Sequence, residues 1–174
     1  MEIPIAARSW VGSKMSSSSK IRMRNCPVDQ RVELRSALDF YIQTLLGPKL
    51  SQHIQTQVLF VHDLRRKERR RGDACWIRSG FERRPRTFRV RVDADIGLRA
   101  KLLVLAHEAA HIKHFARGEL KGLGTDRTLW NGHPVACKSI SYWDYPWEIE
   151  ARGMELSLYV KWKAHKKKLM RENT

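Results

Sequence analysis

Cysteine is rare in this chain, and the cysteines that occur form no framework. There are three among 174 residues, an odd number, and they stand far apart at Cys26, Cys75 and Cys137. This spacing excludes the paired motif of a cysteine zinc site and gives no basis for a disulfide-stapled fold. We therefore expect ordinary core thiols in a reducing compartment.

Long apolar runs are also missing. No segment approaches the roughly 18 consecutive apolar residues that indicate a membrane helix. The first residues, Met1-Glu-Ile-Pro-Ile-Ala, lack the charged and then apolar plan of a secretion signal. From these absences we expect a cytoplasmic protein with no membrane partner.

Acidic residues are scarce relative to basic ones. The chain has 18 Asp and Glu and 34 Lys and Arg, which gives a formal net charge of +16. The basic residues gather in three clusters, Arg65–Arg71, Arg83–Arg86 and Lys161–Lys168. Such clusters are typical of surfaces that bind phosphate backbones, although a solvated basic surface has the same composition. We keep nucleic acid as an expected partner without any recognisable sequence-reading module.

The length of the chain bounds its organisation. A chain of 174 residues with 42% hydrophobic residues is large enough for one domain with a substantial core and small for two. We predict a loosely ordered basic lead-in over 1–25, because it contains a serine run, and a single domain over 26–168. Residues 169–174 would form a tail.

Apolar periodicity predicts an α+β order of elements. Helical spacing covers 28–46 and ends at Gly47-Pro48, and strand-like segments follow at 56–62, 74–79 and 87–92. A buried helix is expected over 98–116, a short hairpin around 130–134, and a last helix over 147–165. The three strands would form a small, mostly antiparallel sheet.

The most informative motif is His107-Glu108-Ala109-Ala110-His111. On a helix, the two histidines lie one turn apart and can direct their ring nitrogens at one metal ion, with Glu108 beside it. Zinc held in this way lowers the pKa of its bound water to roughly 7, and a neighbouring carboxylate can take the proton. The motif fixes only three of five positions, so a helix that binds no metal is the alternative.

The chain resembles the gluzincins, zinc metallopeptidases with a His-Glu-x-x-His motif and a downstream glutamate. It is similar above all to the small single-domain members of minigluzincin or SprT-like kind found in phages and mobile elements. The resemblance lies in His107–His111, in Trp130-Asn-Gly132, and in Tyr142-x-x-x-Pro146-Trp-Glu148-Ile-Glu-Ala151. It implies a zincin-like fold, Zn²⁺ as cofactor, and a place in the host cytoplasm or the virion. A class with a third histidine is excluded, because Arg117 occupies that position.

By this resemblance, Glu148 is the third zinc ligand. Pro146 suits a helix start, and Ala151 lies on the face of Glu148, where a small side chain lets two helices approach. Glu150 is the alternative ligand, and both cannot face the metal. Arg152 stands where related enzymes often place an aspartate that orients a ligand histidine, so another carboxylate must do this. Asp144 and Glu155 are the candidates.

Catalysis by such a site also needs a group that stabilises the oxyanion. We expect Tyr142 or His133 in this role, because both lie between the metal helix and the glutamate helix; Tyr145, Tyr159 and His114 are further candidates. An extended substrate would pair with an edge strand beside the metal, which we expect around Arg89–Val92.

Two functions follow from these observations. The first is a zinc-dependent endopeptidase that acts on a protein or peptide, with Glu108 as general base, and that is recruited to nucleic acid or an acidic partner by its basic surface. The second is a nucleic-acid-binding protein of a phage or mobile element that keeps the fold without proteolysis. Glu108 favours the enzyme, because a purely structural zinc site has no use for it.

Overall fold

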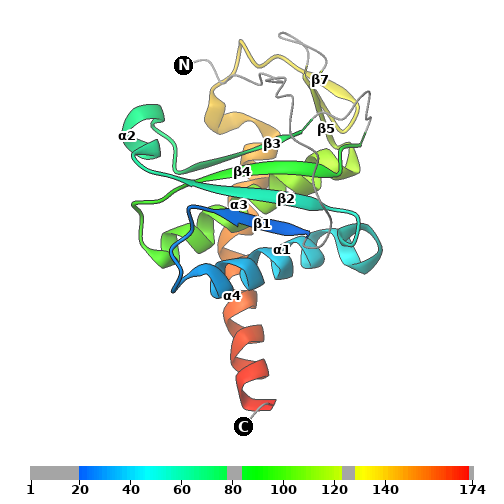
Figure 1. The fold of residues 1–174 in the computed structure, drawn as a ribbon. Helices are drawn as coiled ribbons and strands as arrows, with labels where there is room; N and C mark the ends of the chain where they lie inside the picture. Colours follow the sequence, from blue (N-terminus) through cyan, green and yellow to red (C-terminus); the bar gives the residue numbers. More distant parts are fainter. Residues whose placement is uncertain (1–19, 78–83, 123–127, 173–174) are drawn as a thin grey trace.

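The computed structural model describes residues 20–77, 84–122 and 128–172 and shows an α+β protein. A four-stranded sheet lies against helices, with a second small sheet at one end (Figure 1). The strands of the larger sheet are β1 (Ile21–Arg24), β2 (Gln55–Val61), β3 (Gly72–Trp76) and β4 (Thr87–Asp93). The helices are α1 (Arg31–Ser51), α2 (Leu64–Glu68), α3 (Leu98–Arg117) and α4 (Pro146–Glu172).

The larger sheet has the strand order β1-β2-β4-β3. β1 is parallel to β2 and β2 is parallel to β4, whereas β3 is antiparallel to β4. The prediction of three mostly antiparallel strands was therefore wrong. It missed β1, which lies inside the segment 1–25 that was expected to be loosely ordered; residues 1–19 lie outside the described residues. The predicted strand 74–79 is shifted to β3, and residues 78 and 79 also lie outside the described residues.

The prediction that Arg89–Val92 forms an edge strand was also wrong. β4 lies between β2 and β3, so β3 is the edge strand on that side. Alternation along β4 is as expected, with Phe88, Val90 and Val92 fully buried on the inner face. Alternating apolar and polar residues indicate which face of a strand is covered. They do not indicate which strands lie next to it in the sheet. An inner strand whose outer face is partly open therefore gives the same pattern.

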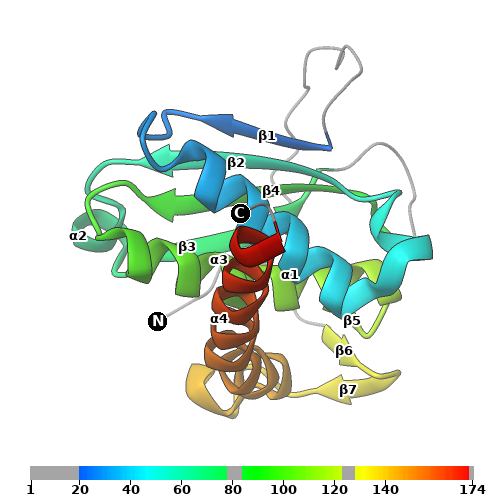
Figure 2. The same cartoon turned by 90° about the horizontal axis from the view of Figure 1, so that it is seen from below.

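Helices α1 and α3 lie on one face of the larger sheet, and α4 crosses beneath them (Figure 2). α1 begins close to the predicted position but continues to Ser51, across a break at Gly47, where φ is +73°. Only glycine adopts such a backbone without strain, and Pro48 follows it. α3 ends at Gly118, also at φ +73°, whose N–H donates to the carbonyls of His114 and Phe115.

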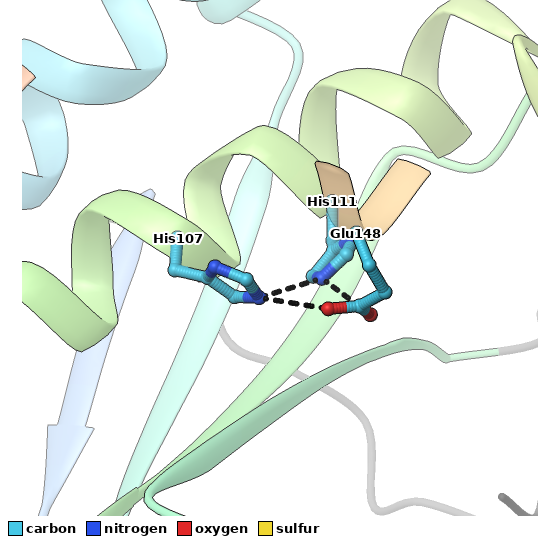
Figure 3. A group of neighbouring side chains, drawn as sticks. All are labelled: His107, His111 and Glu148. Atoms are coloured by element: carbon cyan, nitrogen blue, oxygen red, sulfur yellow. Dashed lines mark hydrogen bonds and ion pairs between the residues drawn. The ribbon is translucent and has the colours of Figure 1, made fainter. Parts of the chain in front are cut away.

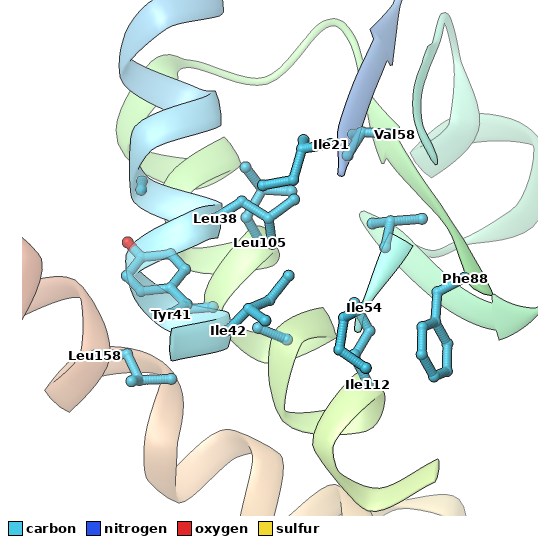
Figure 4. Packing of buried hydrophobic residues seen from close by; sticks show 14 of the residues in the cluster. Ile21, Leu38, Tyr41, Ile42, Ile54, Val58, Phe88, Leu105, Ile112 and Leu158 are labelled. Carbon is cyan, nitrogen blue, oxygen red and sulfur yellow. The ribbon is translucent and has the colours of Figure 1, made fainter. Parts of the chain in front are cut away.

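The core lies between the larger sheet and the helices (Figure 4). Val58 and Phe88 come from the sheet, while Leu38 and Leu105 come from α1 and α3, and all four are almost completely buried. α4 adds Leu158 and Trp162 to this cluster. α3 is held in place by contacts with α1, α4 and the strands β3 and β4.

The second sheet has the order β5-β6-β7 and is antiparallel. Its strands are β5 (Leu120–Gly122), β6 (Thr128–Trp130) and β7 (His133–Val135), followed by the short 3₁₀ helix η1 (Tyr142–Asp144). The predicted hairpin around 130–134 is present, with Asn131 and Gly132 at positive φ in its turn. Within the described ranges, no helix combines the length and apolarity needed to cross a membrane.

Candidate metal centre

Helix α3 carries the three polar residues of the His-Glu-x-x-His motif. It is buried along most of its length between the sheet and the other helices, and its core-facing residues Leu105, Ala109 and Ile112 are almost fully covered. His107 and His111 lie one turn apart on the side toward α4, and their Nε2 atoms are 3.1 Å apart. The helix thus presents two imidazole nitrogens to the same small volume.

Helix α4 brings Glu148 to these histidines in its first turn. The carboxylate faces the Nε2 atoms of both rings, with Oε2 3.4 Å from His107 Nε2 and Oε1 3.3 Å from His111 Nε2 (Figure 3). Ala151 is completely buried one turn later, which lets α4 approach α3. The side chains that sequence reasoning placed together therefore lie together, from two helices about 40 residues apart in the sequence.

The three side chains have the donors and spacing that a zinc ion requires. His107, His111 and Glu148 each offer one ligand atom, and these atoms lie within 4.8 Å of one another. In a tetrahedral site with bonds of about 2.0 to 2.2 Å, neighbouring ligand atoms are separated by about 3.3 to 3.6 Å. The two Nε2 atoms are 3.1 Å apart, and each lies 3.3 or 3.4 Å from a different oxygen of Glu148, so the contacts are close to this separation. Two imidazoles and one carboxylate also match the ligand set of catalytic zinc sites with an open fourth position.

The charges of the cluster are strongly coupled. Burial acts to lower the pKa of His107, but its hydrogen bonds with Glu148 and Glu155 outweigh burial and raise it to about 10. Burial lowers the pKa of His111. For Glu148, burial acts to raise the pKa, and the hydrogen bonds with both histidines overcome it and lower the pKa. The carboxylate is thus held in its anionic form, as a metal ligand must be.

Glu108 lies beside the cluster but does not join it. Its side chain is buried, and Oε2 has no hydrogen-bond partner in the described part of the protein. Burial raises the pKa of this carboxyl to about 8. A buried carboxyl without a partner is costly, and such groups are concentrated at functional sites.

The edge strand β3 passes directly over Glu108. A Cβ atom on Gly72 would lie 2.4 Å from Val104 Cγ1, 2.9 Å from the carbonyl oxygen of Arg91 and 3.1 Å from Glu108 Oε1. Glycine is therefore required where β3 begins, because any side chain would collide with α3 and with β4. The close approach leaves Glu108 next to the open edge of the sheet.

Glu155 is placed to orient His107. Its Oε2 lies 3.3 Å from His107 Nδ1, while His107 Nε2 faces His111 and Glu148. A carboxylate on the second ring nitrogen fixes the tautomer and the direction of a ligand imidazole. Of the two candidates from the sequence, Glu155 is in this position. Asp144 is exposed in η1, and no contact between its side chain and either histidine occurs among the described residues.

Tyr142 and Arg152 surround the outer side of Glu148. Tyr142 is hydrogen-bonded to Glu148, and burial together with this charge raises the pKa of its phenol. Arg152 Nη2 lies 3.4 Å from Glu148 Oε2, and the guanidinium stacks 4.0 Å from the ring centre of Trp143. Sequence reasoning noted Arg152 only as a departure from the expected aspartate. Its spacing of four residues from Glu148 on one helix could have identified this contact.

Glu150 points to a different cluster. Its Oε1 lies 2.5 Å from Lys113 Nζ, which also pairs with Glu119 Oε2 at 3.0 Å. His114, completely buried, lies 3.6 Å from the same Glu150 oxygen, and burial lowers its pKa to about 2. His114, Glu119 and Glu150 could also surround an ion, but the ammonium group of Lys113 already supplies a cation to both carboxylates.

His133 is not part of the site. It is exposed on β7, paired in register with Trp130 on β6, and the described residues give it no contact with the histidines of α3. Trp130 itself packs against the rings of His114 and Trp147, so the small sheet closes the side of the site. Tyr145 donates a hydrogen bond from its hydroxyl to the carbonyl of Cys137, and Tyr159 packs against the core.

Comparison of the chain with family models, with curated proteins and with solved structures gives no significant match.

Proposed function

We propose that this protein is a zinc-dependent endopeptidase of gluzincin type with a zincin-like fold, in which His107, His111 and Glu148 hold the metal. One observation carries the proposal: His107, His111 and Glu148 each offer a ligand atom within 4.8 Å of the other two, beside a buried carboxylate oxygen of Glu108 that has no hydrogen-bond partner in the described part of the chain. A structural metal site needs the first feature but has no use for the second.

Zinc in this position supplies a polarised water of lowered pKa and a Lewis acid for the substrate carbonyl. Glu108 accepts the proton of the attacking water, since its Oε2 is buried beside the ligands and has no hydrogen-bond partner within the described ranges. Its burial excludes bulk water from the carboxylate. The same group then returns the proton to the leaving amine.

Tyr142 is the proposed donor to the developing oxyanion. Its hydroxyl lies at Glu148, next to the metal ligands, and η1 holds it at the outer side of the site. Arg152 adds a positive charge on the same side. A phenol and a guanidinium that are held in place before the reaction stabilise negative charge without reorganisation.

The substrate is proposed to bind as an extended peptide along β3. This strand is the sheet edge beside Glu108, and among the described residues no strand pairs with its side away from β4. Backbone pairing gives affinity with little demand on side chains. The substrate would therefore pair with Gly72–Trp76, and not with Arg89–Val92 as expected from the sequence.

Comparison of the native protein with Glu108→Gln tests the proposal. Both proteins are loaded with zinc, their metal content is measured by mass spectrometry, and cleavage of casein is followed. We expect equal zinc in both and cleavage by the native protein only, with a loss of at least about 100-fold, as for removal of a general base. Equal cleavage by both proteins would refute the role of Glu108. Zinc binding without cleavage in either would favour the non-proteolytic binding protein.

A further inference from the structure

The three basic clusters have different surroundings in the folded protein. In Arg65–Arg71, Arg66 lies 2.9 Å from Asp63, and Arg70 lies within 3.6 Å of both Glu68 and Asp73. Arg91 of β4 pairs with the same two acids. Asp93 and Asp95 line the adjoining surface hollow with Arg65 and Arg66. In this cluster Arg66, Lys67 and Arg70 are thus paired with neighbouring carboxylates, and Arg65 lies in the same hollow as Asp93 and Asp95.

In the second cluster, Arg84 and Arg86 lie at the C-terminal end of α3. Arg86 donates a hydrogen bond of 2.7 Å from Nη1 to the carbonyl oxygen of Ala116, in the last turn of α3. Arg84 lies next to Gly118, the residue that ends this helix. Cations at this end of α3 satisfy free carbonyl groups and the helix dipole. Arg83 lies outside the described residues.

The third cluster lies on the part of α4 that extends away from the body of the protein (Figure 1). Between Glu155 and Glu172, α4 contains no acidic residue and six basic ones. Lys166 pairs with Glu33 of α1, and Lys168 lies 3.7 Å from Glu172. The other four have no acidic partner in the described part of the chain: Lys161, Lys163, Lys167 and Arg171.

Three of these cations form one row. Lys163, Lys167 and Arg171 are four residues apart, so they fall within about 80° of the helix circumference and about 6 Å from one another along the axis. The opposite side of α4 packs on α1 through Trp162, which lies against Phe40. The row therefore points away from the body, where a large partner can reach it.

We propose that this row, Lys163, Lys167 and Arg171, is a docking surface for the phosphate backbone of nucleic acid. Protein interfaces are depleted in lysine and depend on buried aromatic or apolar anchors, which the row lacks. A second copy of the chain is opposed by the repulsion between two molecules of net charge +16. A polyanion gains affinity from each cation as counterions are released, and a single helix fits the major groove of a duplex.

The proposal does not depend on the peptidase function. The row begins 15 residues after Glu148, and within the described residues none of its members contacts His107, His111 or Glu148. Binding of nucleic acid would therefore survive in Glu108→Gln. Failure of one proposal can thus be told from failure of the other.

Binding of a fluorescent 20-base-pair duplex of mixed sequence, measured by anisotropy between 50 and 300 mM NaCl, tests the proposal. The native protein is compared with the triple variant Lys163→Gln, Lys167→Gln, Arg171→Gln. The matched control is Arg65→Gln, Arg66→Gln, Lys67→Gln, which removes the same charge from the cluster beside Asp63, Asp93 and Asp95. If each row residue contacts one phosphate, the slope of log K against log salt becomes shallower by about 2.7 in the first variant. The control changes the slope by less than about 1.

Three results would overturn the proposal. The first is equal weakening in both triple variants, which would mean that only net charge matters. The second is absence of duplex binding by the native protein at 50 mM NaCl. The third is displacement of the duplex by polyglutamate at equal charge concentration, which would indicate an acidic protein partner. The single variant Lys167→Gln, expected to reduce the slope by about 0.9, keeps the test decisive if the triple variant does not fold.

Discussion

At the scale of single residues, Glu148 and Glu150 show how two neighbouring carboxylates take different roles. Glu148 lies within 3.4 Å of both histidines, while Glu150 pairs with Lys113 on another side of α4. Two residues apart on a helix, they are separated by about 200°. Only one of them can face a metal held by His107 and His111, and Glu148 is the one beside these rings.

Substitution of each glutamate by glutamine should separate these roles. We expect Glu148→Gln to lose most of the bound zinc, because an amide is a much weaker ligand than a carboxylate. Glu150→Gln should keep the zinc and unfold at a lower temperature, since Lys113 loses one of its two ion pairs. Zinc per protein chain and the melting temperature are the measurements. Retention of zinc in Glu148→Gln with loss in Glu150→Gln would reverse the ligand assignment.

Gly72 and Gly153 make a second residue-scale prediction. Gly72→Ala forces a methyl group against Val104 and the backbone of Arg91, so we expect a loss of about 1 to 3 kcal/mol in the free energy of unfolding. Gly153 is exposed in α4, and a methyl group added there would meet no neighbouring atom within 4 Å. Gly153→Ala should therefore gain about 0.5 to 1 kcal/mol. Urea denaturation measures both; a neutral Gly72→Ala would show that β3 does not press on α3.

At the scale of elements, the site depends on the contact between α3 and α4. α3 lies in the core, and ion pairs of Glu148, Glu150 and Glu155 with residues of α3 hold the first turns of α4 against it. A metal bound by residues of both helices would fasten them together. Because such an ion would bind only the folded arrangement, its binding energy would add to stability.

Removal of metal should therefore lower the melting temperature. With free zinc about 1,000-fold above its dissociation constant, binding contributes about 4 kcal/mol, and a chelator such as phenanthroline removes this contribution. His111→Ala supplies the control, because it should already lack the ion and show no further change with chelator. An equal response of the native protein and the variant would mean that the helices are not joined by metal at this site.

Several elements could be predicted from the sequence because their signal is local. Three features are local in the sequence: the helical spacing of apolar residues in α3, the His-Glu-x-x-His motif on this helix, and Pro146 at the start of α4 just before Glu148. β1 could not be predicted, because Ile21-Arg-Met-Arg24 has no strong pattern and is defined by pairing with β2. The stack of Arg152 on Trp143 likewise depends on how η1 folds back over α4. Contacts across the fold, rather than local preference, decide these features.

At the scale of the whole molecule, the net charge of +16 is distributed unevenly. Arg91 is bound by Glu68 and Asp73, and this pairing raises the pKa of its guanidinium. By contrast, the outer half of α4 is nearly free of acidic partners in the described part of the chain. Folding brings many Lys and Arg side chains close together. Their charges repel one another over distances comparable to the Debye length.

Salt should consequently stabilise the protein. We expect the melting temperature to rise when NaCl is increased from 20 to 300 mM, because screening reduces the net repulsion more than it weakens the few well-formed ion pairs. Sodium sulfate at equal ionic strength provides a comparison for anion-specific effects. A falling melting temperature would show that ion pairs such as Lys113 with Glu150 dominate over the net charge.

We propose that one metal ion is held by two imidazoles of α3 and one carboxylate of α4. The most direct measurement is an anomalous difference map at the zinc edge from crystals of the protein purified with zinc. The account predicts a single strong peak within about 2.0 to 2.2 Å of His107 Nε2, His111 Nε2 and a Glu148 oxygen. A peak among His114, Glu119 and Glu150, or the absence of any peak in zinc-loaded crystals, would contradict it.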